Sequence, residues 1–482
     1  MSNSSLGLLF LLMGALNPTP LSAQTFTPAN PMNLDRANHT ATLLGNGAVL
    51  VTGGDVITGG QTNTAEIYDP ESGTWRYSRS LMNVARSTHS ATRLLDGRVL
   101  ITGGTNPHAV NSTEIFDPAT EQFTPGASMS VRRATSEAVR LNDGRVMTIA
   151  GRCDNCGGFV TNTVEIFTPG LGTWSPAAPL PVALTNHRAV LLPDGRVLVA
   201  GGYDGFTPIT YSGVYIYHPL VNSWQTMTPL SLPRMNHTAT LLQDGRILIA
   251  GGGPAATFSG HTQVEIYDPS GSGGSGQTTP ASPVAVPRYI HTATLLQDGK
   301  VLLVGGQNGA GSIAQAELYN YASGAWTAPA SLAESRVTHT ATLLPSGRVL
   351  ISGGYQVVGG HITSRLASAE IFGPSCTAPT ITTVTARPNI LWPPNNKFIP
   401  IAVTGNTSGG CGVVSCKIAR LSSNEPVDPA GDWMITGDLA LSLRAKRLGD
   451  GNGRTYGIEV QCTDNLGNRS TKAVSVSVPH SQ

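Results

Sequence analysis

Six histidines occupy one position of a repeated sequence pattern, and histidine is the side chain that most often acts as a general base or metal ligand near neutral pH. The six are His39, His89, His187, His237, His291 and His339. A seventh copy of the pattern carries Ser136 at this position. A catalytic or metal site is needed once per molecule, whereas a residue present in almost every repeat stabilises the repeat itself. We therefore interpret these histidines as structural and expect each to hydrogen-bond a neighbouring repeat.

Arginine and glutamate recur at two further positions of the pattern. An arginine precedes the histidine position by three residues in six copies: Arg36, Arg86, Arg133, Arg234, Arg288 and Arg336. A glutamate opens the third apolar run in six copies: Glu66, Glu114, Glu165, Glu265, Glu317 and Glu370. The fourth copy lacks both and has Leu184 and Tyr215 instead, which indicates that each arginine pairs with the glutamate of its own copy. We expect half-buried, bidentate structural pairs. The alternative is an arginine-lined mouth that binds an anionic ligand.

Cys153 and Cys156 are a third group that could do chemistry. A redox-active pair of this spacing lies at the start of a helix, which stabilises the thiolate, whereas the residues around this pair have the pattern of strands. A metal site would need more ligands, and every other cysteine lies beyond residue 375. In an exported chain we expect a local disulfide that contributes less than about 3 kcal/mol. We expect no metal ion and no other cofactor.

Several polar and aromatic residues occur once only, in the variable segments that follow the second apolar run of a copy. They are His108, Tyr203, Asp204, Phe206, His261 and His361. Binding residues are concentrated on loops that a rigid scaffold holds, so we predict that these six contribute to a ligand site. The sequence shows no convincing nucleophile–histidine–acid arrangement and no carboxylate pair. A hydrolase or lyase built from four of these loop residues is kept as an alternative: His108, Asp204, His261 and His361.

The elements that position these residues are short strands. The histidine position returns every 47 to 54 residues, which is the period of a radially repeated all-β unit. Each copy holds four short apolar runs separated by Gly, Asp and Pro, as expected for four strands. Asp-Gly joins the first two runs in copies two to six and predicts a two-residue hairpin with positive φ, as at Asp96-Gly97. A Gly pair such as Gly53-Gly54 ends the second run, where we expect another chain segment to approach closely.

The pattern resembles the kelch repeat of β-propellers. A run that ends in Gly-Gly is followed by a loop, an aromatic residue, a short spacer and a tryptophan, as between Gly201-Gly202 and Trp224. The Arg-x-x-His and Asp-Gly-Arg-Val details are similar to the galactose-oxidase-like branch of kelch proteins. Seven copies align over residues 25–373. The resemblance implies an all-β chain in which residues 24–375 form a seven-bladed kelch β-propeller.

The ends of the repeat region predict how the ring closes. The seventh copy has no fourth run after Phe372, because the chain changes character at Gly373-Pro374. The missing run is present at the other end, where Phe26-Thr27-Pro28 matches Phe123-Thr124-Pro125. We therefore expect the N-terminal segment near Phe26 to form the outermost strand of the last blade.

Residues 376–482 lose the repeat but keep short alternating runs, which suits one small β-sandwich. Motifs such as Leu391-Trp392-Pro393-Pro394 and Cys462-Thr463-Asp464-Asn465 resemble an Ig-like module of secreted bacterial proteins. Four cysteines in this region allow three disulfide pairings, and the sequence does not choose among them: Cys376, Cys411, Cys416 and Cys462.

The N-terminus predicts export. Residues 6–16 form an apolar run that is too short to span a bilayer and has the length of a signal-peptide core, with cleavage expected near Ala23. We therefore predict a signal peptide over residues 1–23, no membrane span, and a secreted, periplasmic or cell-surface location. A net charge of +1 with 12% charged residues argues against nucleic acid as a partner. We expect a monomer.

The resemblance also raises copper-radical chemistry, because galactose oxidase combines a kelch propeller with an Ig-like domain. That family uses two tyrosines, two histidines and a cysteine linked to one of the tyrosines. Here the propeller cysteines are Cys153 and Cys156 alone, and the only histidine of the C-terminal module is His480. The ligand set therefore cannot be carried over to this chain.

We predict a binding protein rather than an enzyme. The expected ligand is a glycan or a protein, recognised through the upper face, which is the face that carries the loops after the second run. These loops are residues 56–64, 105–112, 152–163, 203–213, 253–263 and 355–368. The alternative is a carbohydrate-active enzyme, whether oxidase-like, lyase or hydrolase, with its site in the propeller mouth.

Overall fold

The computed structural model of the chain describes most residues from Gln24 to His480. The described ranges are 24–57, 59–154, 156, 159–205, 207–257, 259–374, 378–410, 413–428, 431–449, 452–464 and 467–480. The predicted signal peptide over residues 1–23 lies outside them, as do Phe206, Cys376 and Cys411.

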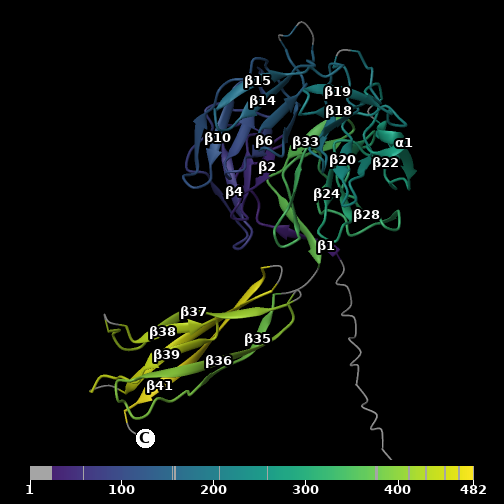
Figure 1. Cartoon of the computed structure of the whole chain (residues 1–482). Coiled ribbons are helices and arrows are strands. Elements are labelled where there is room, and N and C mark those ends of the chain that lie inside the picture. Colours follow the sequence, from purple (N-terminus) through teal and green to yellow (C-terminus); the bar gives the residue numbers. More distant parts are fainter. Residues whose placement is uncertain are drawn as a thin grey trace, which may run out of the picture.

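The repeat region of the described chain forms seven four-stranded antiparallel sheets of one design, numbered here as blades 1 to 7 (Figure 1). Blades 1 to 3 contain β2 (Thr40–Leu43), β3 (Val49–Thr52), β4 (Ala65–Asp69) and β5 (Thr74–Tyr77); β6 (Ser90–Arg93), β7 (Val99–Thr102), β10 (Thr113–Asp117) and β11 (Gln122–Pro125); and β12 (Glu137–Arg140), β13 (Val146–Ile149), β14 (Val164–Thr168) and β15 (Thr173–Ala177). Blades 4 and 5 contain β16 (Arg188–Leu191), β17 (Val197–Ala200), β18 (Val214–His218) and β19 (Ser223–Met227); and β20 (Thr238–Leu241), β21 (Ile247–Ala250), β22 (Val264–Asp268) and β23 (Gln277–Ala281). Blades 6 and 7 contain β24 (Thr292–Leu295), β25 (Val301–Val304), β28 (Ala316–Asn320) and β29 (Ala325–Thr327); and β30 (Thr340–Leu343), β31 (Val349–Ser352), β34 (Ala369–Pro374) and β1 (Gln24–Ala29).

The sheets are arranged in a closed ring around a central channel. The first strand of each blade lies beside the first strand of the next blade, and β30 of blade 7 lies beside β2 of blade 1. The second strand of every blade is buried along its whole length, because apolar side chains from both neighbouring sheets cover it. These near-continuous apolar runs are what a strand covered on both faces requires. The prediction of an all-β propeller is therefore confirmed.

The N-terminal strand β1 completes blade 7. Phe26 pairs with Phe372 across the sheet, and their ring centroids lie 5.0 Å apart. The same aromatic contact joins the third and fourth strands of other blades, as between Tyr68 and Trp75 at 4.9 Å. The first and last parts of the repeat region therefore share one sheet, which covers the outer edge of β34.

Replacing Phe26 tests this closure. We expect Phe26→Asp to lower the free energy of unfolding by about 2–3 kcal/mol, because it removes a half-buried ring from its contact with Phe372 and places a charge there. Hydrogen exchange should then accelerate first in β34. The matched control Phe123→Asp should accelerate exchange in β10 instead, since Phe123 contacts Phe116 of that strand. Early exchange of blade 1 in Phe26→Asp would contradict the closure.

The hairpins between the first and second strands differ from the prediction. At β6–β7, the Leu94 N–H donates to the Arg98 carbonyl, and the Gly97 N–H donates to the Leu94 carbonyl. Gly97 has φ +91°, whereas Asp96 has no positive φ. The expected two-residue turn is therefore wrong, and the connection is a longer turn in which glycine alone takes the left-handed conformation. Asp96 instead accepts the Arg98 N–H through Oδ1 at 3.0 Å.

The Gly pairs lie where chain segments touch. A Cβ on Gly53 would lie 2.3 Å from the Arg86 carbonyl oxygen of the next blade, and a Cβ on Gly54 would lie 2.7 Å from the Ala37 carbonyl oxygen. No side chain fits at these distances, so the close approach predicted from the sequence is confirmed.

The C-terminal residues form a β-sandwich (Figure 1). One sheet has the order β35 (Thr380–Arg387), β36 (Phe398–Ser408), β39 (Ala440–Arg444) and β38 (Trp433–Gly437); the other has the order β37 (Ser415–Ser423), β40 (Gly453–Thr463) and β41 (Arg469–Pro479). Leu443, Ile458 and Val476 are among the fully buried residues between them. A disulfide joins Cys416 on β37 to Cys462 on β40. Across the described ranges, no helix has the length and apolar character needed to cross a membrane.

Candidate functional site

The mouth of the channel and the long loops lie on one face of the propeller. In each blade the segment that enters the first strand pairs with the loop that leaves the second strand, as in the bridges Ala37–Asp55, Ser87–Thr105 and Thr185–Tyr203. The loops with the most varied sequences therefore surround the channel mouth. This is the upper face on which the sequence predicts the ligand site.

Some of these loops form extra strands above the blades. In blade 2, β8 (Thr105–Asn106) and β9 (His108–Ala109) make a small hairpin. The loops of blades 6 and 7 combine into one four-stranded sheet of β26 (Gln307–Asn308), β27 (Gly311–Ser312), β32 (Tyr355–Val358) and β33 (His361–Arg365). These additions make one side of the mouth different from the other, although the blades themselves repeat.

Two of the predicted binding residues are exposed at the tips of these additions. The His108 side chain is 76% exposed, and its Nδ1 lies 3.8 Å from the Asp154 carboxylate on the loop of blade 3. His361 is exposed at the start of β33 in blade 7. The two histidines therefore belong to separate blades and separate loop structures.

The other predicted binding residues contact their own surroundings. Tyr203 pairs with Thr185 in an isolated antiparallel β-bridge. Asp204 accepts a hydrogen bond from the Thr207 hydroxyl. His261 Nε2 lies 3.3 Å from the Pro233 carbonyl oxygen, and burial lowers the pKa of this histidine. Phe206 lies outside the described residues. All five described candidates are on upper-face loops, and their joint action on one ligand stays a prediction.

The repeated arginines and glutamates form six ion pairs within the blades. The N–O distances are between 2.7 and 3.0 Å for Arg36–Glu66, Arg86–Glu114, Arg133–Glu165, Arg234–Glu265, Arg288–Glu317 and Arg336–Glu370. All six arginine side chains are fully buried, and the glutamates are at most 6% exposed. The burial is deeper than the half-buried state expected from the sequence, and it excludes the alternative of an arginine-lined mouth that contacts a ligand.

The pairs are also not bidentate. Arg36 donates through Nη2 to Glu66 Oε1 at 2.7 Å and through Nη1 to the Gly53 carbonyl at 2.8 Å. The second glutamate oxygen accepts the backbone N–H of Asn33 at 2.7 Å. Each pair therefore links the entry segment, the Gly-Gly corner and the third strand of its blade. Burial lowers the pKa of Arg36, and the Glu66 carboxylate offsets part of that effect.

The repeat histidines lie between adjacent inner strands, and four of them bond to the preceding blade. His89 Nε2 lies 2.9 Å from Thr40 Oγ1 of blade 1, and His339 Nε2 lies 2.9 Å from Thr292 Oγ1 of blade 6. The same contact joins His291 to Thr238 and His39 to Thr340, both at 3.1 Å. The predicted bond to a neighbouring repeat is therefore present at four of the six positions.

The histidine–threonine pattern is broken around blades 3 to 5. The residue after each histidine position is Thr or Ser in five blades, but it is Glu137 in blade 3 and Arg188 in blade 4. His187 and His237 therefore face a blade that lacks the hydroxyl, and neither of their ring nitrogens has a hydrogen-bond partner among the described residues. An unsatisfied buried polar group costs about 1–3 kcal/mol. This break was not predicted, although comparing the residue after each histidine would have found it.

Glu137 and Arg188 form an ion pair inside the channel. Arg188 donates through Nη1 to Glu137 Oε1 at 2.6 Å and through Nε to the His237 carbonyl at 2.8 Å. The arginine side chain is 35% exposed and the glutamate 25% exposed. Across the described chain, Arg188 Nη2 and Glu137 Oε2 have no protein partner, so both are available to a ligand. A pair this exposed contributes only about 0–1 kcal/mol to stability.

The pair faces a cavity of about 410 Å³ at the channel mouth. The residue before each histidine position lines it in all seven blades, and each has a φ between +49° and +55°: Asn38, Thr88, Thr135, Asn186, Asn236, Ile290 and Thr338. Backbone hydrogen bonds join neighbouring members, such as the Thr88 N–H to the Asn38 carbonyl at 2.9 Å. A left-handed β-branched residue persists only where the surroundings impose it. The seven residues therefore form a fixed ring around the cavity, and most of their side chains carry an amide or a hydroxyl group.

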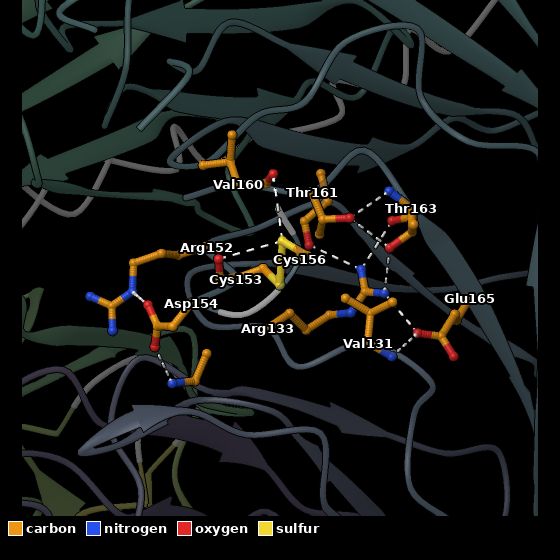
Figure 2. The surroundings of a disulfide bond; sticks show 12 residues. Val131, Arg133, Arg152, Cys153, Asp154, Cys156, Val160, Thr161, Thr163 and Glu165 are labelled. Carbon is orange, nitrogen blue, oxygen red and sulfur yellow. Dashed lines mark hydrogen bonds and ion pairs between the residues drawn. A yellow bond between two sulfur atoms is a disulfide. The ribbon is translucent and has the colours of Figure 1, made fainter. Parts of the chain in front are cut away.

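The disulfide between Cys153 and Cys156 lies in the upper loop of blade 3, and Figure 2 shows it with the Arg133–Glu165 pair of the same blade. Cys153 is buried, and the next residue, Asp154, lies 3.4 Å from Arg152 Nε. The bond joins residues three apart in sequence, so it constrains little of the unfolded chain.

Removing this disulfide should have a small effect. We expect the double variant Cys153→Ser, Cys156→Ser to lower the free energy of unfolding by less than about 2 kcal/mol, because the closed loop is very short. Denaturant titration of this variant beside the wild type measures the difference. Loss of the cooperative unfolding transition would show that the disulfide holds the blade together and would contradict this expectation.

The copper site of the galactose-oxidase-like branch does not fit this channel. Four of the inner histidines direct Nε2 at hydroxyl groups of the preceding blade, and within the described ranges no three His, Cys, Asp or Glu side chains are grouped to hold a metal ion. His480 lies in the sandwich, where its Nε2 is 3.1 Å from the Gly449 carbonyl oxygen. We therefore derive no reaction step through copper for this chain.

Comparisons with known proteins agree with the propeller. Residues 36–82, 86–130 and 185–231 match the family model described as the Kelch motif. A search of curated proteins finds no match. Among solved structures, a fungal alcohol oxidase of the AA5 family in complex with copper superposes with a TM-score of 0.62 at 16% identity, covering 94% of this chain and 99% of that chain. The structure of YjhT superposes with a TM-score of 0.49 at 15% identity, covering 62% and 99%.

At such low identity, the likeness to the alcohol oxidase establishes the fold and leaves activity open. The Kelch motif matches lie on blades 1, 2 and 4, whose Gly-Gly corners and inner histidines recur around the ring. This chain is therefore a β-propeller in which three segments match the Kelch motif.

Proposed function

We propose that this chain is an exported binding protein that recognises a glycan or a protein through the upper face of its propeller. The observation that carries the proposal is the polar cavity at the channel mouth, which opens among the most dissimilar loops of the molecule. Concave sites with a few convergent polar groups are the usual places of ligand binding. The buried arginines, glutamates and histidines support the scaffold, and the exposed singular residues face the ligand.

A glycan array and a pull-down with soluble proteins test the proposal on the full exported chain. We expect retention of a glycan or protein without chemical change of the bound molecule. A substrate panel with metal analysis examines the carbohydrate-active alternative. Turnover of any sugar substrate by the purified chain would replace binding with catalysis as the function.

The location and assembly state belong to the same proposal. Cleavage after Ala23 would give a mature chain that begins with Gln24, the first residue of β1, and the Cys416–Cys462 disulfide suits an oxidising compartment. We propose that the sandwich is an Ig-like module and that the mature protein is a monomer. Amino-terminal sequencing and light scattering of the exported protein measure both properties.

A further inference from the structure

The Glu137–Arg188 pair differs from every other ion pair of the repeat. The six buried pairs occur at one place in six blades, whereas Glu137 and Arg188 occur once each, on adjacent inner strands that face the channel. They replace the threonine that four other blades use to bond a histidine of the next blade. The replacement leaves His187 and His237 without partners among the described residues.

A purely structural role does not account for this exchange. A partly exposed pair stabilises little, and an unpartnered buried imidazole destabilises. Three departures from the repeat also gather in neighbouring blades: Ser136 replaces the histidine of blade 3, and Glu137 and Arg188 replace threonine in blades 3 and 4. A set of adjacent departures that reduces stability and faces a cavity is typical of a functional site.

The chemistry of the pair indicates its ligand. Arg188 Nη2 is a donor and Glu137 Oε2 is an acceptor, and the two belong to one salt-bridged unit without net charge. A ligand that matches them must present an acceptor beside a donor and carry no charge of its own. Two neighbouring hydroxyl groups of a sugar meet both conditions, because each hydroxyl can accept and donate. The amides and hydroxyls of the surrounding ring can bond the other hydroxyls of such a ligand.

We propose that Glu137 and Arg188 together bind a vicinal diol of an uncharged sugar residue in the channel mouth. This inference rests on the proposed binding function and names its ligand class and its specificity-determining residues. The cavity of about 410 Å³ has room for a sugar unit. The ion pair can make two charge-assisted hydrogen bonds to it, which are stronger than hydrogen bonds between neutral groups.

The test is a double substitution that restores the repeat. Glu137→Thr with Arg188→Thr supplies the hydroxyls that His187 and His237 lack. We expect the variant to bind neutral oligosaccharides about 100-fold more weakly than the wild type. We also expect its Tm to rise by about 2 °C, since two buried histidines gain partners. The probes are an array of neutral, carboxylated and sulfated oligosaccharides, followed by titration calorimetry with the tightest neutral binder.

A matched control changes the same residue types elsewhere. Arg76 and Glu121 form an ion pair between blades 1 and 2 that is away from the channel lining, with Nη1 2.6 Å from Oε2. Arg76→Thr with Glu121→Thr should leave binding unchanged. Should the double channel variant fold poorly, Glu137→Gln keeps the side-chain shape and should still weaken binding about tenfold, because it removes the charged acceptor.

Each outcome has a distinct meaning. If the wild type retains no glycan of the array and no soluble protein, the proposed function is overturned, and this inference with it. Undiminished binding of neutral sugars by the channel variant, or a lower Tm, would overturn the inference and leave the binding function standing. If the wild type prefers the carboxylated or sulfated probes, the proposal that the ligand is an uncharged sugar is also overturned.

Discussion

Lowering the pH from 7 to 5 is expected to lower the free energy of unfolding by more than about 5 kcal/mol. Each of three buried histidines contributes about 2 kcal/mol to this loss. Burial, together with the charge of a neighbouring arginine, lowers the pKa of His89, His187 and His339 to about 3. In the unfolded chain the same side chains titrate near 6.5. Between these values the unfolded state binds more protons, so stability is complete above pH 6.5 and falls progressively toward pH 3.

Denaturant titrations at pH 7, 6 and 5 measure this loss. The control is His339→Ser, which gives blade 7 the residue that blade 3 carries naturally at this position. That variant should be less stable at pH 7, because the contact with Thr292 is lost, but its stability should fall by about 2 kcal/mol less between pH 7 and pH 5. An unchanged pH dependence would show that the histidines are not what makes the fold sensitive to acid.

Arg234→Ala is expected to destabilise the propeller by about 3–5 kcal/mol, because it leaves the Glu265 carboxylate buried without its cation. It also removes the donor that reaches the Gly251 carbonyl at 2.8 Å. Glu265→Ala should have a similar cost, and the double variant should cost much less than the sum of the two, since the partners act as one unit. Thermal or denaturant unfolding of the four proteins gives the coupling energy.

Blade 4 provides the matched control for this pair. It replaces the arginine and glutamate with Leu184 and Tyr215, both buried. Arg234→Leu with Glu265→Tyr copies that solution into blade 5, and we expect it to be more stable than Arg234→Ala alone. Additive effects of the two alanine substitutions would mean that the arginine and glutamate do not depend on each other.

Much of the scaffold follows from sequence spacing. The period of the histidine positions predicts the repeated sheet, and the match between Phe26 and Phe123 predicts which strand completes the last one. The joint absence of arginine and glutamate in one copy predicts their pairing, because a partner left alone in a buried site would be costly. These inferences succeed because each rests on a feature present in many copies.

Details that depend on geometry within one turn or one pair could not be obtained in this way. Asp96-Gly97 has the composition of a two-residue hairpin, but Asp96 bonds its own turn and glycine alone takes the positive φ. The arginine–glutamate pairs are end-on because a backbone N–H takes the second carboxylate oxygen, and no side-chain pattern reveals that bond.

The channel pair escaped prediction for a different reason. Recurring residues dominate a repeat sequence, whereas Glu137 and Arg188 are significant because they do not recur. The predicted loop residues lie on the upper face but on separate loops, which differ in length and in local structure. A position-by-position comparison of the seven inner strands reveals the departure from the sequence alone.

The most direct test of the account is a crystal structure of the exported chain with its tightest-binding oligosaccharide from the array. We expect one sugar unit to occupy the channel mouth, with adjacent hydroxyls within hydrogen-bond distance of Arg188 Nη2 and Glu137 Oε2. A sugar bound on the sandwich or on the outer edges of the blades, with the mouth holding only water, would contradict it.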